Sequence, residues 1–148
     1  MVGSCRAADD EALVANLKER AADMNISGSI KFKVNVPFSE IISIFQSASI
    51  ALHTMKFEHF GITPVEMMAA GILLIAHNSA GPKLDIVGPA TETAGFLATD
   101  LDSYVKHLLF CIEGCDRQTS EYDKIKLYAR EWVTTKFAVS CFEEQFYE

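Results

Sequence analysis

Several features are missing from this 148-residue sequence, and each absence excludes a class of protein. The longest uninterrupted apolar run, Met67 to Ala76 with Gly71 included, is far shorter than the ~20 residues of a membrane-spanning helix. The opening MVGSCRAADDE lacks the apolar segment of a secretory signal. We therefore expect no transmembrane segment and a soluble chain.

The sequence also has no cluster of basic residues. The chain has thirteen Lys and Arg residues and twenty Asp and Glu residues, which gives a net charge of −7. A basic patch is the usual footprint of a nucleic-acid-binding protein, so we expect no nucleic-acid partner. No Gly-x-Gly-x-x-Gly turn is present, which argues against a nicotinamide-dependent oxidoreductase.

Cysteine is scarce and scattered, at Cys5, Cys111, Cys115 and Cys141. A domain of this size needs no disulfides to fold, which favours reduced thiols in a reducing, cytosolic compartment. Cys111 and Cys115 are one helical turn apart, but with only His107 nearby they lack the fourth ligand of a zinc site. Core thiols are the better interpretation.

Apolar runs alternate with helical patterns along most of the chain. Runs that are apolar on both faces, separated by helices, are typical of a parallel sheet covered on both sides. The expected strands are residues 29–34, 49–54, 72–78 and 95–99. The expected helices are residues 11–24 with Asp9 or Asp10 as its cap, 39–48, 64–70, 82–87, 102–113 and most of 117–148.

This order predicts an α/β fold, a Rossmann-like parallel sheet with helices on both faces. We expect one domain over residues 1–148, in which residues 117–148 are a helical C-terminal extension. The residues expected to pack in that extension are Tyr122, Ile125, Leu127, Tyr128, Trp132, Phe137 and Phe146. The opening MVGSC has the character of the last residues of a strand, so we expect the domain to be truncated at its N-terminus.

Polar residues gather where two of the expected strands end. His53 ends one strand, and His77, Asn78 and Ser79 end the next, with residues 58–66 between them. Ligands of open parallel sheets bind beyond the carboxyl ends of the strands, so we expect a binding site here. The sequence leaves two interpretations open for each histidine, a hydrogen bond to a ligand or to a neighbouring backbone group.

Two turns of small residues at this edge fit a diphosphate. The helix expected from Pro64 directs unpaired N–H groups and a partial positive charge toward the crevice. Gly61 would let a phosphate approach the backbone. A second turn over residues 79–83 contains Gly81 and ends at Lys83, a cation suited to phosphate.

Two glutamates, Glu58 and Glu66, flank the first turn. Because carboxylates repel phosphate, they fit there only as acceptors for hydroxyl groups on its two sides, such as the ribose and the sugar of a nucleotide sugar. Glu66 has a second interpretation, because Thr63 and Glu66 have the spacing of a capping box. Asp100 and Asp102 have the Asp-x-Asp form of a metal site, but they also begin a helix, and we expect capping.

The segment EHFGITPVEMMAAG, residues 58–71, resembles the Glu-x7-Glu signature of retaining glycosyltransferases with the two-Rossmann-domain (GT-B) architecture. The likeness continues through AHNSAGPKLDIV and AGFLA, and its strong part covers about residues 50–98. Within this family the pattern is most similar to the GDP-mannose-dependent α-1,2-mannosyltransferases of asparagine-linked glycosylation. Those enzymes extend a dolichol-linked oligosaccharide at the cytosolic face of the endoplasmic reticulum membrane.

The resemblance implies a role for each site residue. Glu66 would bind the ribose hydroxyls, while Glu58 would face the donor sugar and help to stabilise charge at its anomeric carbon. The backbone of residues 60–62 would approach the sugar and diphosphate, and the turn beginning at Val34 would lie near the base. Transfer would need no metal or other cofactor, because hydrogen bonds would stabilise the leaving diphosphate. The predicted site comprises catalytic Glu58 and the donor-binding residues Glu66, Phe60, Gly61, Ile62, His53, Asn78, Ser79, Gly81, Lys83 and Val34.

Some parts of the family pattern are not found in these residues. A basic pair for the diphosphate is absent, as is the amino-terminal domain with the acceptor site and membrane anchor, and Ala80 stands where relatives usually have Gly. We therefore expect a C-terminal, donor-binding half that binds its donor weakly alone, with the lipid-linked oligosaccharide acceptor held by the absent domain. The alternative is a catalytically inactive nucleotide-sugar-binding or interaction fragment.

Overall fold

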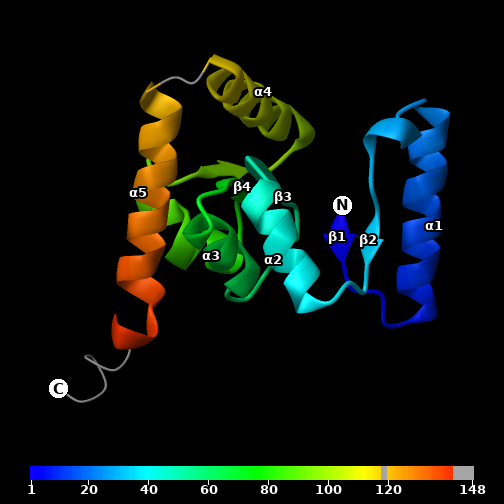
Figure 1. Ribbon diagram of the computed structural model, residues 1–148, viewed down its shortest axis with the longest axis horizontal. Helices are drawn as coiled ribbons and strands as arrows, with labels where there is room; N and C mark the ends of the chain where they lie inside the picture. The colour runs from blue at the N-terminus through cyan, green and yellow to red at the C-terminus, as the bar shows by residue number, and fades with distance from the viewer. Residues whose placement is uncertain (118–119, 142–148) are drawn as a thin grey trace. The chain divides into compact units, whose positions relative to one another are not determined.

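The computed structural model of the chain describes residues 1–117 and 120–141. The chain divides into two compact units, Met1–Ile44 and Phe45–Glu148 (Figure 1). The first unit contains β1 (Val2–Gly3), α1 (Ala8–Asp23), a 3-10 turn η1 (Ser27–Ser29), β2 (Lys33–Val34) and most of α2 (Phe38–Ser47). It is a small βαβα unit with the predicted order of elements.

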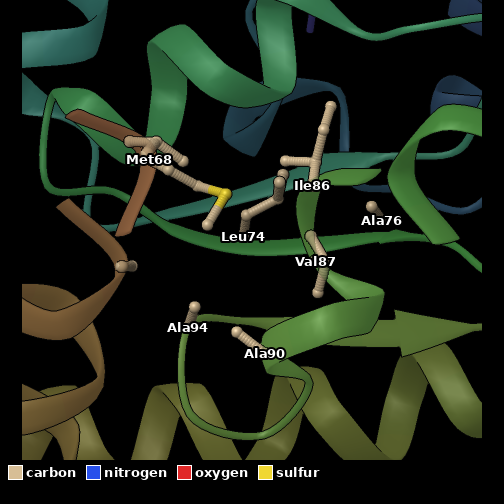
Figure 2. Close-up of a cluster of buried hydrophobic side chains, with 9 residues drawn as sticks. Met68, Leu74, Ala76, Ile86, Val87, Ala90 and Ala94 are labelled. Carbon is tan, nitrogen blue, oxygen red and sulfur yellow. The ribbon is translucent and has the colours of Figure 1, made fainter. Parts of the chain in front are cut away.

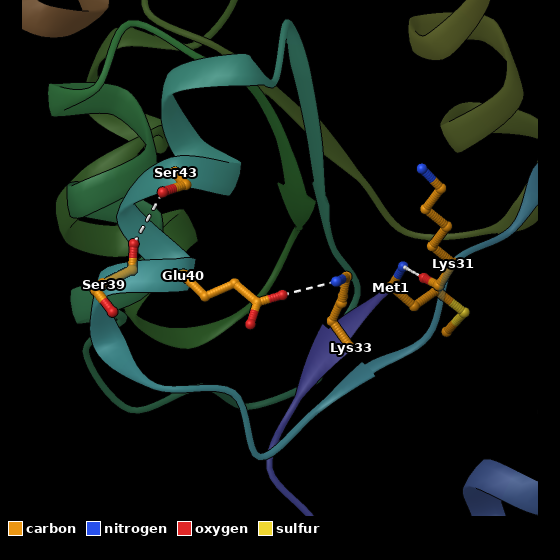
Figure 3. A network of polar contacts seen from close by, with 6 residues as sticks. All are labelled: Met1, Lys31, Lys33, Ser39, Glu40 and Ser43. Atoms are coloured by element: carbon orange, nitrogen blue, oxygen red, sulfur yellow. Dashed lines mark hydrogen bonds and ion pairs between the residues drawn. The ribbon is translucent and has the colours of Figure 1, made fainter.

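In the first unit, β1 and β2 form a parallel two-stranded sheet. The strand expected over residues 29–34 is shorter than predicted, because β1 supplies only two residues to pair with it. Two polar contacts hold the ends of this unit (Figure 3). Lys33 Nζ lies 2.7 Å from Glu40 Oε1, and the amino group of Met1 donates to the carbonyl oxygen of Lys31 at 2.6 Å.

Helix α1 begins at Ala8, earlier than the predicted start at residue 11. Ala7 occupies the N-cap position, and Asp9 and Asp10 lie in the first turn, from which Asp10 accepts the N–H of Ala7 as in a capping box. The carboxylate of Asp10 accepts hydrogen bonds from the backbone N–H groups of Arg6 (2.8 Å) and Ala7 (3.1 Å), and these bonds lower the pKa of Asp10. The acid therefore satisfies donors that precede the helix, which lets the helix start before it.

The second unit is built on a parallel sheet with the strand order β3-β4-β5. Its elements are β3 (Ile50–His53), α3 (Ile62–Ala69), β4 (Leu73–His77), a π-helical turn η2 (Pro82–Ile86), a 3-10 turn η3 (Gly88–Ala90), β5 (Phe96–Ala98), α4 (Leu101–Arg117) and α5 (Ser120–Phe137). The strands expected at 49–54, 72–78 and 95–99 are confirmed. Helix α4 continues beyond the predicted end at residue 113, and the expected helix at 82–87 is the short π-helical turn.

The strand β4 is buried on both faces, as its unbroken apolar sequence predicts. On one face Leu74 packs with Met68 of α3 (Figure 2). Val133 of α5 belongs to the same cluster. On the other face Leu73 and Ile75 pack with Phe96 and with Cys111 of α4. Alternate residues of a strand point to opposite faces, so helices cover the sheet on both sides.

Helix α5 adds to this core through one face only. Tyr122, Ile125, Ala129 and Val133 are buried on it. Leu127 is 70% exposed and Tyr128 43% exposed, so the expected packing of Leu127 is wrong, because residue 127 lies on the far side of the helix from that face. Packing is confirmed for Trp132 and Phe137, which lie against the core cluster. Phe146 lies outside the described residues.

Candidate functional site

The carboxyl ends of β3 and β4 lie side by side, with His53 in register with Ala76. The loop of residues 54–61 follows β3, and the turn of residues 78–81 follows β4. These two connections bring together the predicted residues around Glu58 and around Ser79. The expected clustering of polar residues at this edge is therefore present.

Two hydrogen bonds tie the connections to each other. The N–H of Phe57 donates to Ser79 Oγ at 3.0 Å, and the N–H of Gly81 donates to the carbonyl oxygen of Glu58 at 2.9 Å. A Cβ atom at Gly81 would collide with the carbonyl oxygen of Phe60 and would lie 2.7 Å from that of His59. Gly81 is thus required where two stretches of backbone meet.

Helix α3 begins at a left-handed Gly61, whose φ of +102° favours glycine. A Cβ there would lie 3.1 Å from the side chains of Ile86 and Pro64, so protein atoms account for this glycine. The first helical hydrogen bond runs from the N–H of Val65 to the oxygen of Gly61. The N–H groups of Ile62 and Thr63 precede that bond and have no acceptor within the helix.

The predicted capping box is wrong. Gly61 occupies the cap position, no side chain caps the helix, and Thr63 already lies inside it. Glu66 is an exposed residue of α3, beyond the first turn. Among the described residues, its carboxylate has no hydrogen-bond or ion-pair partner. Capping therefore does not explain this acid.

Glu58 lies beside His53, with its Oε2 atom 3.8 Å from His53 Nε2. The side chain of Glu58 is 26% exposed and that of His53 13% exposed. Burial lowers the pKa of His53, and the charge of Glu58 partly opposes the shift. The imidazole is therefore neutral at neutral pH. Its Nδ1 atom is buried and has no hydrogen-bond partner in the described part of the chain.

His77 is the one charged or polar side chain that is fully buried among the described residues, at 7% exposure. Its Nδ1 atom lies 2.9 Å from Ser79 Oγ, and its Nε2 atom is buried without a hydrogen-bond partner in those residues. His77 therefore contacts a neighbouring side chain, whereas the two interpretations of the sequence were a hydrogen bond to a backbone group and one to a ligand. Ser79 thereby contacts both β4 and the loop after β3.

The remaining predicted residues are distributed around this centre. Three of them are exposed: Asn78, Lys83 and Ile62. Phe60 is 43% exposed, and its ring packs edge-on against that of Phe137, with 5.6 Å between the ring centroids. Val34 belongs to the other unit, where it ends β2. Its predicted place near a base stays a prediction.

Two residues at this edge were not foreseen. Phe57 has a left-handed backbone (φ +59°) and a side chain that is 73% exposed, and nothing in the sequence marks it. Tyr104 of α4 donates from its hydroxyl to the carbonyl oxygen of His53 at 3.3 Å. The helical spacing of Tyr104 and Leu108 with Cys111 is the signal that could have placed Tyr104 against the sheet.

The other candidate chemical groups have structural roles. Asp100 Oδ1 accepts the N–H of Ser103 at 2.9 Å and the Ser103 hydroxyl at 2.7 Å, which lowers the pKa of Asp100 and confirms a role at the start of α4. Burial raises the pKa of Cys111 to about 11, as expected of a core thiol. His107 stacks on Phe96 at 4.8 Å. Among the described residues, no group of three or more His, Cys, Asp or Glu side chains is placed to hold a metal.

Comparison with known proteins identifies relatives for nearly the whole chain. The family model for glycosyl transferases group 1 matches residues 1–132. Three relatives carry the name GDP-Man:Man(3)GlcNAc(2)-PP-Dol alpha-1,2-mannosyltransferase. The Xenopus laevis protein is 51% identical over 105 residues, the human protein 45% over 113, and the Dictyostelium discoideum protein 34% over 146. The matches cover 70%, 74% and 99% of this chain but only 21%, 23% and 28% of those relatives.

Solved structures give the same fold. A glycosyltransferase from Rickettsia africae superposes with a TM-score of 0.83 at 21% identity, over 99% of this chain and 38% of that one. The C-terminal domain of a group 1 family glycosyl transferase (LpcC) from Francisella tularensis gives 0.73 at 22% identity, over 90% and 66%. The predicted α/β fold of a C-terminal GT-B domain is confirmed. The structure also shows no helix, in the ranges it describes, that is long and apolar enough to cross a membrane.

Proposed function

Because this chain belongs to the group 1 glycosyl transferases, we propose that it is the donor-binding part of a GDP-mannose-dependent α-1,2-mannosyltransferase. The single observation that supports this most directly is the pair of acids around the Gly61 turn. Glu58 Cγ lies 3.4 Å from the position of a Cβ at Gly61, and Glu66 lies on the helix that Gly61 begins. Neither acid has a competing capping role among the described residues.

In this proposal the start of α3 binds the diphosphate. The N–H groups of Ile62 and Thr63 have no helical acceptor, and the helix dipole adds partial positive charge at the same end. Lys83 is exposed and supplies a full positive charge to the second turn. Asn78 is exposed beside that turn and donates hydrogen bonds.

The two acids then bind hydroxyl groups on either side of the diphosphate. Glu66 accepts hydrogen bonds from the ribose, and Glu58 faces mannose, where its charge stabilises the positive charge that develops at the anomeric carbon. The neutral imidazole of His53 beside Glu58 leaves that carboxylate uncompensated for this role. We propose that transfer retains the anomeric configuration and needs no metal, with backbone N–H groups and Lys83 stabilising the leaving diphosphate.

The chain spans about a quarter of the length of the curated relatives it matches, so the acceptor is assigned by proposal as well. The names of those relatives specify an oligosaccharide on dolichyl diphosphate. We propose the same acceptor, bound by protein outside these 148 residues, in assembly of the N-glycan precursor. The corresponding location is the cytosolic face of the endoplasmic reticulum membrane.

Isothermal titration calorimetry with GDP tests the donor site. Glu66→Ala is expected to weaken GDP binding at least about tenfold, because hydrogen bonds to a charged group contribute about 1.5–3 kcal/mol. Glu113→Ala, at an exposed glutamate of α4 in the same unit, is the matched control and should leave the affinity unchanged. Equal affinities for wild type and Glu66→Ala would remove Glu66 from the ribose site. Titration with UDP in place of GDP tests the choice of base.

A further inference from the structure

Ser79 lies at the centre of the contacts that join the two connections. Its Oγ atom accepts the N–H of Phe57 at 3.0 Å and lies 2.9 Å from Nδ1 of the buried His77. A serine hydroxyl has one proton and two lone pairs, so these two partners take up most of its capacity. The sequence predicts that Ser79 contacts the donor directly, whereas in the structure its hydroxyl contacts Phe57 and His77.

We propose that Ser79 is a positioning residue, which holds the loop that carries Glu58 in the geometry needed to face the donor sugar. This inference rests on the donor-binding function proposed above. Ser79 acts on Glu58 through the backbone of Phe57, the residue before it, and makes no contact of its own with the sugar.

Glu58 is held from both sides along the backbone. The hydrogen bond from Phe57 to Ser79 precedes it, and its own carbonyl oxygen accepts the N–H of Gly81. Both bonds lead to the turn after β4, so the backbone that carries the Glu58 side chain is held against that turn. From this backbone the carboxylate reaches its position 3.8 Å from His53 Nε2.

Backbone strain at Phe57 shows why its hydrogen bond to Ser79 is needed. Phe57 has a φ of +59°, a conformation that is unfavourable for a residue with a Cβ atom, and its side chain is 73% exposed. Packing of the phenyl ring therefore does little to hold this conformation. The hydrogen bond to Ser79 is the interaction that stabilises it, and His77, fixed in β4, holds the hydroxyl in place.

Binding of GDP and of GDP-mannose distinguishes this role from direct contact with the donor. Ser79→Ala is expected to weaken GDP-mannose binding about tenfold, the loss that corresponds to one hydrogen bond, while GDP, which lacks the sugar, changes less than about twofold. Ser79→Thr keeps the hydroxyl and should restore affinity. Ser49→Ala, at an exposed serine of the same unit, is the matched control.

A double-mutant cycle tests whether Ser79 acts through Glu58. Glu58→Gln alone should show the same selective loss of GDP-mannose affinity, and addition of Ser79→Ala should cause little further loss. Additive losses would overturn the proposal, because Ser79 would then act independently of Glu58. Equal weakening of GDP and GDP-mannose by Ser79→Ala would also overturn it and would assign Ser79 to the diphosphate.

Amide hydrogen exchange tests the hydrogen bond between Phe57 and Ser79 without any nucleotide. In Ser79→Ala, the Phe57 amide should exchange at least about tenfold faster, while the amides of Gly81 and Leu74 keep their protection. Unchanged exchange at Phe57 would overturn the proposal even where donor binding is normal. If the wild-type chain binds neither nucleotide, the proposed function fails, and the exchange result still decides whether Ser79 holds the loop.

Discussion

The Oε2 atom of Glu58 lies 3.8 Å from Nε2 of His53, at the edge where β3 ends. This separation is longer than a hydrogen bond, so Glu58 acts on His53 through its negative charge, which favours the protonated form of the imidazole. Both side chains are largely shielded from water, which preserves that interaction. His53 is therefore a reporter of the charge on Glu58.

Removing that charge should change the titration of His53. Glu58→Gln is expected to lower the pKa of His53 further, because the negative charge of Glu58 opposes the effect of burial. A titration of the imidazole C–H signals by nuclear magnetic resonance measures the shift. His107 is the control, because burial and Lys106 lower its pKa and Glu58 plays no part in it. An unchanged or raised pKa of His53 would contradict the geometry of the pair.

The same histidine makes stability depend on pH. Burial places the pKa of folded His53 below its ordinary value of 6.5, so between these two values the unfolded chain binds more protons. The free energy of unfolding should fall as the pH drops below about 6.5 and level off below the folded pKa. His107 acts in the same direction. His53→Gln should reduce the slope of the free energy of unfolding against pH. Urea unfolding at several pH values, followed through the fluorescence of Trp132, the single tryptophan, measures that slope. An unchanged slope would argue against a buried, neutral His53.

Ala80 is strained, and glycine should relieve the strain. Its φ of +43° lies in the left-handed region, where a residue with a Cβ atom costs about 1–2 kcal/mol. Ala80→Gly is expected to raise the free energy of unfolding by about 0.5–1 kcal/mol, because the relief exceeds the entropic cost of glycine. Ala70→Gly, at a right-handed φ of −72°, should instead lower it by up to about 1 kcal/mol. Urea unfolding measures both, and destabilisation by Ala80→Gly would refute the strain.

Substitution of Leu74 tests the packing of the core most strongly. Leu74 is a fully buried residue of β4 that packs against α3 and α5, so Leu74→Ala should cost about 2–5 kcal/mol of unfolding free energy. Leu127→Ala is the matched control, since its side chain is 70% exposed and its loss should cost less than about 0.5 kcal/mol. Similar losses for the two variants in chemical denaturation would contradict the packing described for α5.

The regular part of the fold could be predicted because its signals are local. The run Leu73 to Ala76 is apolar without interruption, and a strand buried on both faces is what such a run requires. The packing predicted for Leu127 is wrong because a single apolar residue does not reveal which face of a helix is buried; several residues at helical spacing are needed. Once Ile125 and Ala129 define the buried face of α5, residue 127 must lie away from it.

The gathering of polar residues at the ends of β3 and β4 could be predicted from the sequence, whereas the contacts between the two connections could not. The Thr63–Glu66 spacing suggested a cap, but the left-handed Gly61 starts the helix earlier, and sequence spacing does not report φ. The contact of Phe57 with Ser79 joins residues from two loops, and no local pattern encodes it. It depends on how the ends of two neighbouring strands are aligned, which only the folded sheet determines.

A crystal structure of the chain with GDP-mannose bound tests the central claim most directly. We predict the diphosphate at the N–H groups of Ile62 and Thr63, the ribose hydroxyls on Glu66, and mannose facing Glu58, with Ser79 still bonded to Phe57. A nucleotide bound elsewhere, or one that contacts neither glutamate, would contradict the account.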